Sequence, residues 1–332
     1  MDARAEELRT WLETEAGLTD FEIVPASEDA SFRRYFRVHT ADGTRIAMDA
    51  PPEREDSRPF VEIAGWLELI GVNAPRILAA NLRRGFLLLT DLGSLPYLTA
   101  LEREPGSADR LYGDALAALR RIQERGRQWQ RRLPPYDEKL LRFELSLFRD
   151  WLCGRHLGLE LTGDRERSWA ACCDLLVANA LDQPRVFVHR DYHSRNLMVT
   201  ETANPGILDF QDAVEGPLTY DLVSLLKDCY IRWPAERVRD WALAHFAALD
   251  RELLGGLGQQ ELLARFELMG VQRHLKAAGI FARLCHRDGK AGYLRDVPRT
   301  LSYVLEVAPR YPALEFLAHL VEHEVLPRMA RG

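Results

Sequence analysis

The stretch VHRDYHSRNLMV, residues 188–199, contains polar residues whose types and spacing suit the transfer of a phosphoryl group. That chemistry needs a group to accept the proton of the attacking hydroxyl, and oxygen ligands for magnesium. Asp191 supplies a carboxylate for the first task, and Asn196, five residues later, offers a neutral oxygen to a metal ion. Asp209, in the stretch ILDF, adds a carboxylate as a further ligand for the metal ion. The order of these three residues predicts a magnesium-dependent site.

Three further polar residues are expected to shape this site rather than to react. His189 and Arg190 precede the carboxylate in H-R-D, and Asp191 needs a fixed backbone more than it needs a relay. Asp221 begins the apolar stretch DLVSLL, where two roles are open to it. It caps a helix, or it accepts hydrogen bonds from the catalytic loop.

The H-R-D-x-x-x-x-N spacing is also that of protein kinases, but the residues that follow argue against a protein substrate. Only eleven residues, 210–220, separate Asp209 from Asp221, which leaves no room for the long segment that binds a peptide. There is no A-P-E motif, and the triplet at Asp209 is DFQ rather than DFG. We therefore expect a small-molecule acceptor, bound by the helices after Pro217.

The elements that must position these residues follow two patterns. The first 93 residues predict a small, mostly antiparallel sheet with helices at 5–16 and 58–71, and strands at 21–26, 31–40, 44–50 and within 74–93. From about residue 107, long helices dominate, at 108–130, 137–157 and 165–181. This order predicts an α+β, two-lobed, protein-kinase-like fold. The nucleotide-binding N-lobe is expected over 1–93, and the C-lobe with the catalytic loop over 94–332.

The first lobe also predicts how ATP would be held. The stretch PASEDASFRRYFRV, 25–38, lies where a glycine-rich phosphate loop would be, yet it has no glycine, and no lysine precedes Lys139. An arginine must then supply the phosphate cation, and alternation puts Arg33 and Arg37 on one face of the strand and Arg34 on the other. The adenine is expected against the backbone of GFLLLTDLG. The predicted ATP-binding residues are Ser31, Arg33, Arg34, Met48, Leu89, Thr90 and Asp91.

Composition excludes several other classes of protein. A net charge of −6 over 332 residues argues against a surface built for nucleic acid or anionic lipid. No run of about eighteen apolar residues predicts a membrane span, and the acidic N-terminus does not resemble a secretory signal. Five cysteines without a C-x-x-C pair predict neither disulfides nor a zinc site. We expect a cytoplasmic monomer.

Longer motifs carry a resemblance to a known family. Over residues 21–311 the chain resembles the aminoglycoside-phosphotransferase-like family of anomeric sugar kinases, through DASFRRYFRV, MDAPPE, GFLLLTDLG, VHRDYHSRNLM, DFQDAVEGPLTYDLVSLLKDCY and QRHLKAAGIFARLCHRDGK. The resemblance implies a kinase that uses ATP and Mg²⁺ to phosphorylate the C1 hydroxyl of N-acetylmuramate or N-acetylglucosamine, for cell-wall sugar recycling. It implies Asp191 as the base and Asn196 and Asp209 as magnesium ligands. One departure is Glu28, where relatives commonly carry glycine.

Such an acceptor suggests further binding residues and leaves two alternatives. A lactyl carboxylate pairs well with arginine, for which Arg195 and Arg273 are candidates, while His193 and Glu144 are candidates for sugar hydroxyls. One alternative is another small-molecule phosphotransferase of the aminoglycoside type, whose site should be lined with carboxylates to receive a polycation. The other is a non-catalytic nucleotide-binding regulator, which the missing lysine and glycines would allow.

Overall fold

The computed structural model describes residues 2–28 and 32–331. It divides into two compact units, Met1–Ala115 with Asn196–Asp212 and Leu116–Arg195 with Ala213–Gly332. Each unit is described by itself below. The predicted lobe boundary after residue 93 stays a prediction.

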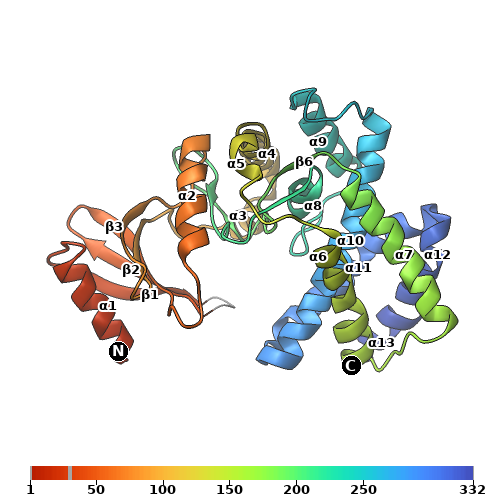
Figure 1. Cartoon of the computed structure of the whole chain (residues 1–332), viewed down its shortest axis with the longest axis horizontal. Helices are drawn as coiled ribbons and strands as arrows, with labels where there is room; N and C mark the ends of the chain where they lie inside the picture. The colour runs from red at the N-terminus through yellow and green to blue at the C-terminus, as the bar shows by residue number, and fades with distance from the viewer. Residues whose placement is uncertain (1, 29–31, 332) are drawn as a thin grey trace. The chain divides into compact units, whose positions relative to one another are not determined.

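The first unit contains the predicted antiparallel sheet, in the strand order β1-β2-β3-β5-β4 (Figure 1). Its strands are β1 (Glu22–Glu28), β2 (Arg34–Thr40), β3 (Gly43–Asp49), β4 (Ile77–Asn81) and β5 (Phe86–Thr90). A tight turn joins β2 to β3, with Thr40 paired to Gly43. Gly43 has a φ of 120°, which explains why a glycine ends the sequence ADG.

Helix α1 (Ala3–Thr14) covers one face of this sheet (Figure 1). The side chains of Leu8, Trp11 and Leu12 pack with Val38 and Phe86 of the sheet in one buried cluster. The helix begins two residues earlier than the predicted range because the Asp2 carboxylate caps it, accepting a hydrogen bond from the backbone N–H of Ala5.

Helix α2 (Arg58–Ile70) follows the third strand, as predicted. It ends at Gly71, whose φ of 84° is the left-handed conformation that commonly closes a helix. Its Phe60 ring lies 4.8 Å from the ring of Phe210, measured between centroids. The helix therefore packs on the segment that follows Asp209.

A short hairpin of β7 (Leu197–Met198) and β8 (Gly206–Ile207) completes the sheet structure of the first unit. Asn196 directly precedes β7, and Asp209 follows β8 by two residues. Because the two strands pair antiparallel, these side chains are brought to the same end of the hairpin. Helix α3 (Tyr97–Arg103) and a 3₁₀ turn (Pro105–Ser107) lead into α4 (Ala108–Arg125).

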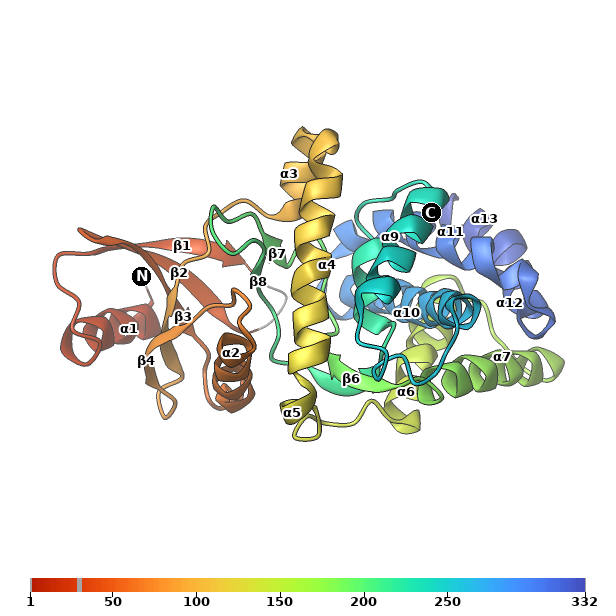
Figure 2. The same cartoon turned by 90° about the horizontal axis from the view of Figure 1, so that it is seen from above.

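The second unit is built around one long helix, α10 (Gln259–Asp288), which Figure 2 shows among its neighbours. The elements that contact it are α6 (Glu138–Leu147), a π-helix (Phe148–His156), α7 (Asp164–Leu181), α8 (Tyr220–Leu226), α9 (Ala235–Ala248), a 3₁₀ segment (Ala291–Asp296) and α11 (Val297–Val307). The remaining elements are α5 (Arg127–Gln130), 3₁₀ turns (Ala308–Arg310 and Pro312–Leu314), α12 (Glu315–Leu320), a second π-helix (Val321–Val325) and α13 (Leu326–Met329).

A two-stranded sheet of β6 (Arg185–Val188) and β9 (Val214–Pro217) lies in the same unit. The predicted catalytic loop, residues 189–195, begins where β6 ends, at His189. No helix in the described part of the chain is long and apolar enough to cross a membrane.

The predicted helix over 137–157 divides into α6 and the π-helix that starts at Phe148. At this point Gly279 of α10 approaches so closely that a Cβ on it would lie 2.3 Å from the Leu147 carbonyl carbon and 2.4 Å from the Phe148 nitrogen. The change of helix type therefore coincides with a backbone contact that helical periodicity does not reveal. The predicted helix over 108–130 is likewise interrupted, at Gly126.

Candidate functional site

The catalytic loop is fixed at its start by Asp221. One oxygen of this carboxylate accepts the backbone N–H of His189 at 2.6 Å, and the other accepts that of Arg190 at 2.9 Å. Of the two roles open to Asp221, the structure contains the bond to the loop, whereas Thr219 stands at the N-cap position of α8. Arg190 has a φ of 78°, a conformation that costs about 1–3 kcal/mol and is found where surrounding contacts enforce it.

A second carboxylate, which sequence reasoning missed, fixes the end of the loop. Asp228 accepts hydrogen bonds from the Ser194 backbone N–H at 2.9 Å and from its hydroxyl at 2.5 Å. The other oxygen of Asp228 accepts the backbone N–H of Tyr230 at 2.9 Å. A signal for this role exists in the sequence, since Asp228 follows Asp221 by seven residues in an otherwise largely apolar stretch.

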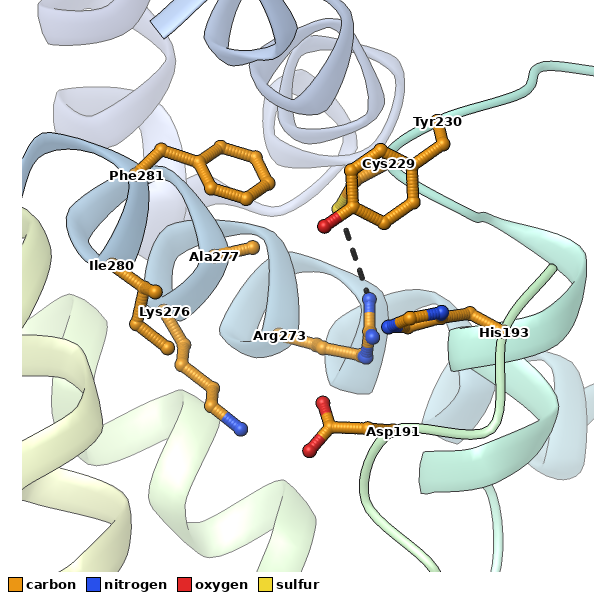
Figure 3. Close-up of a pocket in the computed structure, with 9 residues that line it drawn as sticks. All are labelled: Asp191, His193, Cys229, Tyr230, Arg273, Lys276, Ala277, Ile280 and Phe281. Carbon is orange, nitrogen blue, oxygen red and sulfur yellow. Dashed lines mark hydrogen bonds between the residues drawn. The ribbon is translucent and has the colours of Figure 1, made fainter. Parts of the chain in front are cut away.

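The loop and one face of α10 enclose a pocket (Figure 3). The residues that line it are Asp191, His193, Cys229, Tyr230, Arg273, Lys276, Ala277, Ile280 and Phe281. Those from α10 recur at three- and four-residue intervals, which places them on one side of the helix. Figure 3 shows the Arg273 and Lys276 side chains extending from α10 toward Asp191. The structure thus brings together three predicted residues, Asp191, His193 and Arg273, and adds Lys276.

The charges around Asp191 keep it ionised. Burial acts to raise its pKa, but the positive charges of Lys276 and Arg273 outweigh this and hold the pKa at about 2. Burial lowers the pKa of His193 to about 4, so this ring is neutral at pH 7. The Nδ1 atom of His193 is buried and has no hydrogen-bond partner among the described residues. The pocket therefore offers one carboxylate and one neutral imidazole beside two cations.

Glu144, which was predicted to bind sugar hydroxyls, lies behind this pocket. Its side chain is almost fully buried. One carboxylate oxygen accepts hydrogen bonds from Arg190 at 2.6 Å and forms an ion pair with Lys276 at 3.3 Å. The other oxygen accepts bonds from the Tyr136 hydroxyl and from the Gln272 amide. Four donors in the interior thus engage this carboxylate, and its binding of sugar hydroxyls stays a prediction.

Arg273 is a buried cation with a weak partner. Its side chain is 5% exposed, and one Nη atom lies 3.8 Å from the sulfur of Cys229, the dashed line in Figure 3. Its Nε atom is buried and has no hydrogen-bond partner among the described residues. Because a buried guanidinium is costly without an acceptor, this arrangement suits an anionic group of a ligand.

Arg195, the other predicted partner of a carboxylate, is placed differently. Its guanidinium lies 4.6 Å above the ring centre of Tyr230 and 5.6 Å from that of Tyr293. The side chain is exposed and does not line the pocket, although Tyr230 does. Arg195 therefore contacts a residue of the pocket without lining the pocket itself.

The predicted magnesium ligands lie together in the first unit. The amide nitrogen of Asn196 lies 3.2 Å from one oxygen of Asp209, and the amide nitrogen of Gln211 lies 2.7 Å from the other. The amide oxygen of Gln211 is buried and has no hydrogen-bond partner among the described residues. Mg²⁺ prefers oxygen ligands, and each of these three side chains carries at least one oxygen atom. One carboxylate with two amides therefore fits this metal, and Gln211 is an addition to the predicted set.

The arginines predicted for ATP all lie beside carboxylates of the first unit. Arg33 pairs with Glu55 at 3.1 Å, and Arg37 pairs with Asp91 at 2.6 Å. Arg34 pairs with Asp49 at 2.5 Å and also with Asp2. Asp49 is fully buried and also accepts a bond from Arg4 at 2.7 Å, so the end of β3 holds an acid with two cationic partners.

Four other predicted ATP residues lie on the strands of the same sheet or just beyond them. Met48 is fully buried in β3, and Leu89 and Thr90 belong to β5, which pairs with strands on both sides. The backbone of these two residues is thus used within the sheet, and Asp91 is the first residue beyond it. Ser31 lies outside the described residues.

Comparisons with known proteins show the family of the chain. A model of the phosphotransferase enzyme family matches residues 22–257. The chain is 48% identical to a Pseudomonas aeruginosa protein named N-acetylmuramate/N-acetylglucosamine kinase, over 96% of both chains. It is 45% identical to a protein of the same name from Pseudomonas putida, again over 96% of both.

A solved structure of a choline/ethanolamine kinase family protein from Mesorhizobium loti is also similar. It aligns with a TM-score of 0.63 and 15% identity, over 99% of this chain and 100% of that one. At this identity the likeness shows the fold alone, and it confirms the predicted two-lobed, protein-kinase-like α+β fold.

Proposed function

The chain belongs to the phosphotransferase enzyme family and is an ATP-dependent phosphotransferase, and from this premise we propose that it phosphorylates the C1 hydroxyl of N-acetylmuramate or N-acetylglucosamine. The observation that carries the proposal is the pocket at Asp191, with the buried cations Arg273 and Lys276. The product, a sugar 1-phosphate, would return cell-wall amino sugars to use.

The charge of the pocket favours this acceptor over an aminoglycoside. Asp191 is the only acid among the nine residues that line it, and Arg273 and Lys276 are positively charged. A polycationic antibiotic would be repelled by such a site, whereas the lactyl carboxylate of N-acetylmuramate would pair with Arg273. Kinase-named relatives over nearly the whole chain also leave the non-catalytic regulator without support.

Asp191 would orient the attacking hydroxyl. A carboxylate with a pKa of about 2 is a weak base, so it accepts the proton late, as bonding to phosphorus develops. An anomeric hydroxyl is more acidic than other sugar hydroxyls, which makes it the acceptor best suited to such a base. His193, neutral and with a buried ring nitrogen available, would hydrogen-bond a sugar hydroxyl.

Magnesium would be held by Asn196 and Asp209, with Gln211 beside them. When bound, it supplies positive charge to the phosphates of ATP. The nucleotide would lie along the first unit, with the adenine at the backbone of Asp91, the first residue beyond the sheet, next to Leu89 and Thr90 and with Met48 beneath it. Arg33 and Arg34 would supply positive charge to the phosphates in place of the missing lysine.

A panel of acceptors tests the proposal. ADP release is followed with ATP, Mg²⁺ and N-acetylmuramate, N-acetylglucosamine, glucose or kanamycin. We expect release with the two amino sugars only. Release with kanamycin, and none with either amino sugar, would favour the antibiotic-modifying alternative.

Arg273→Gln tests the carboxylate partner. A charge-assisted hydrogen bond contributes about 1.5–3 kcal/mol, so KM for N-acetylmuramate should rise by about 10- to 100-fold while KM for N-acetylglucosamine, which lacks the carboxylate, changes little. Arg195→Gln shows whether the stacked arginine shares this task. Arg265→Gln, on α10 but outside the pocket, is the control. An equal loss for both sugars would remove Arg273 as the residue that recognises the carboxylate.

A further inference from the structure

We propose that Lys276 is a catalytic residue, whose ammonium group donates a hydrogen bond to the acceptor oxygen while that oxygen attacks phosphorus. The inference rests on the proposed phosphoryl transfer beside Asp191, but it does not depend on which sugar is the acceptor. Sequence motifs gave Lys276 no role, because it lies 85 positions after Asp191 in the chain.

The ammonium group of Lys276 is held in place from behind. It donates to the Tyr220 hydroxyl at 2.9 Å and pairs with Glu144 at 3.3 Å. An ammonium group has three N–H donors, and the third has no partner among the described residues. The side chain is 7% exposed, and Figure 3 shows its nitrogen at the wall of the pocket that faces Asp191. The unused donor is therefore available to a ligand in the pocket.

The partners of Glu144 argue against a purely structural lysine. Arg190 alone gives this carboxylate a cation at 2.6 Å, closer than Lys276, and Tyr136 and Gln272 occupy its second oxygen. Lysine is also rare here, with four among 44 basic residues. A compact ammonium binds a single oxygen, whereas the planar arginine fork suits two. A lysine at this position suits one attacking oxygen.

In the step itself, the acceptor oxygen forms a bond to the γ-phosphorus as the bond from that phosphorus to the leaving oxygen of ADP breaks. The electron pair of the broken bond leaves with ADP, and the hydroxyl proton passes to Asp191. Lys276 keeps its three protons throughout. Its contribution is to hold the acceptor oxygen in line and to place positive charge beside the transferred phosphoryl group, whose oxygens carry the negative charge of the transition state.

The test uses Lys276→Ala in a Glu144→Gln background, so that loss of the ammonium group leaves no excess negative charge at residue 144. Removing one preorganised donor costs about 10²–10³ in kcat, and we expect that loss relative to Glu144→Gln alone, with KM for the acceptor changed less than tenfold. Ethylammonium, added at millimolar concentrations, should restore part of kcat because it occupies the space that the lysine side chain leaves. Lys227→Ala, which removes a buried lysine outside the pocket, is the control. Its kcat should equal that of the wild type, and added ethylammonium should not change it.

Two results would overturn the assignment. One is a kcat for the double variant that equals that of Glu144→Gln. The other is a loss of kcat in a folded double variant that no alkylammonium ion restores, which would make Lys276 a framework residue. If the panel finds an acceptor other than an amino sugar, the same comparison is made with that acceptor, so a failure of the proposed substrate is separate from a failure here.

Discussion

Asp191 combines two properties that seldom occur together, limited access to water and a pKa of about 2. Burial alone would raise the pKa, so the low value reports the cations that Lys276 and Arg273 place beside the carboxylate. Such a group binds a hydroxyl as an anion at neutral pH. Its task is thus to position the nucleophile and to receive the proton late.

Asp191→Asn removes the charge but keeps the size of the side chain. We expect kcat to fall by about 10²–10⁴, the usual range for loss of a general base, while KM for ATP changes by less than a few fold. Steady-state kinetics with saturating amino sugar measures both. Asp240→Asn, an exposed acid on α9, is the control. Unchanged kcat in Asp191→Asn would end the assignment of the base.

The motif residues of the site could be predicted from sequence because each is tied to a local spacing. Asp191, Asn196 and Asp209 fall within nineteen positions of one another and share one functional pattern. Lys276 and Tyr230 could not be found in this way, since the pocket gathers them from α10 and from the segment after α8. For Glu144 the sequence indicates only a polar residue on an amphipathic helix, and its burial and its four partners are visible only in the structure.

Gly279 sets the distance between α10 and the helix formed by residues 138–156. No side chain fits between its Cα and the backbone at Leu147 and Phe148, where a Cβ would come within 2.4 Å of backbone atoms. Since Lys276 lies one turn earlier on α10 and Glu144 one turn before this contact, the spacing of the two helices also sets the ion pair between them.

Gly279→Ala should therefore destabilise the protein although alanine favours helices. Overpacking of a tight core costs about 1–3 kcal/mol, and backbone has less freedom to yield than side chains. Equilibrium urea unfolding measures the change. Gly65→Ala in α2 is the matched control, because nothing lies within 4 Å of its added Cβ, and it should gain about 0.5–1 kcal/mol. Equal stability of the two variants would contradict the close approach.

Elements with clear periodicity and end signals were predictable to within a few residues. Helix α2 lies within the predicted 58–71 and α7 begins one residue before the predicted 165. The π-helix after Phe148 was not predictable, because it coincides with a contact from residue 279, far along the chain. Helix propensity depends on neighbouring residues in the sequence, whereas this contact joins residues about 130 positions apart.

The pH dependence of stability belongs to the molecule as a whole, and the buried His245 contributes to it. Burial lowers the pKa of His245 to about 3, and this ring hydrogen-bonds Gln123 at 2.9 Å. In the unfolded chain a histidine takes up a proton below about pH 6.5. Between pH 6.5 and 3 the unfolded state therefore binds more protons, so stability falls as pH falls.

Each such histidine contributes a slope of about 1.4 kcal/mol per pH unit within this window. His245→Gln should reduce the slope of unfolding free energy against pH between 6 and 4 by about that amount, whatever its effect at pH 7. Urea unfolding at several pH values measures the slope. His319→Gln, at an exposed histidine, should leave the slope unchanged. A slope in His245→Gln equal to that of the wild type would contradict the claim that His245 is neutral in the folded protein.

At the scale of the chain, the change from strands to long helices near residue 107 was enough to predict the fold class. The two compact units were harder to foresee, because the first of them includes residues 196–212, which return to it after eighty residues of the second. A change of pattern along the sequence predicts only one boundary between domains. That residues 196–212 belong to the first unit is seen only in the structure, where β7 pairs with β8 within that unit.

The position of the phosphate on the product tests the central proposal most directly. The protein is incubated with ATP, Mg²⁺ and either N-acetylmuramate or N-acetylglucosamine, and the product is analysed by phosphorus–proton correlation NMR and by a reducing-end assay. We predict one ADP per reducing end lost, with phosphorus coupled to the anomeric proton. A phosphorylated sugar that keeps its reducing end, or no ADP with either sugar, would contradict the account.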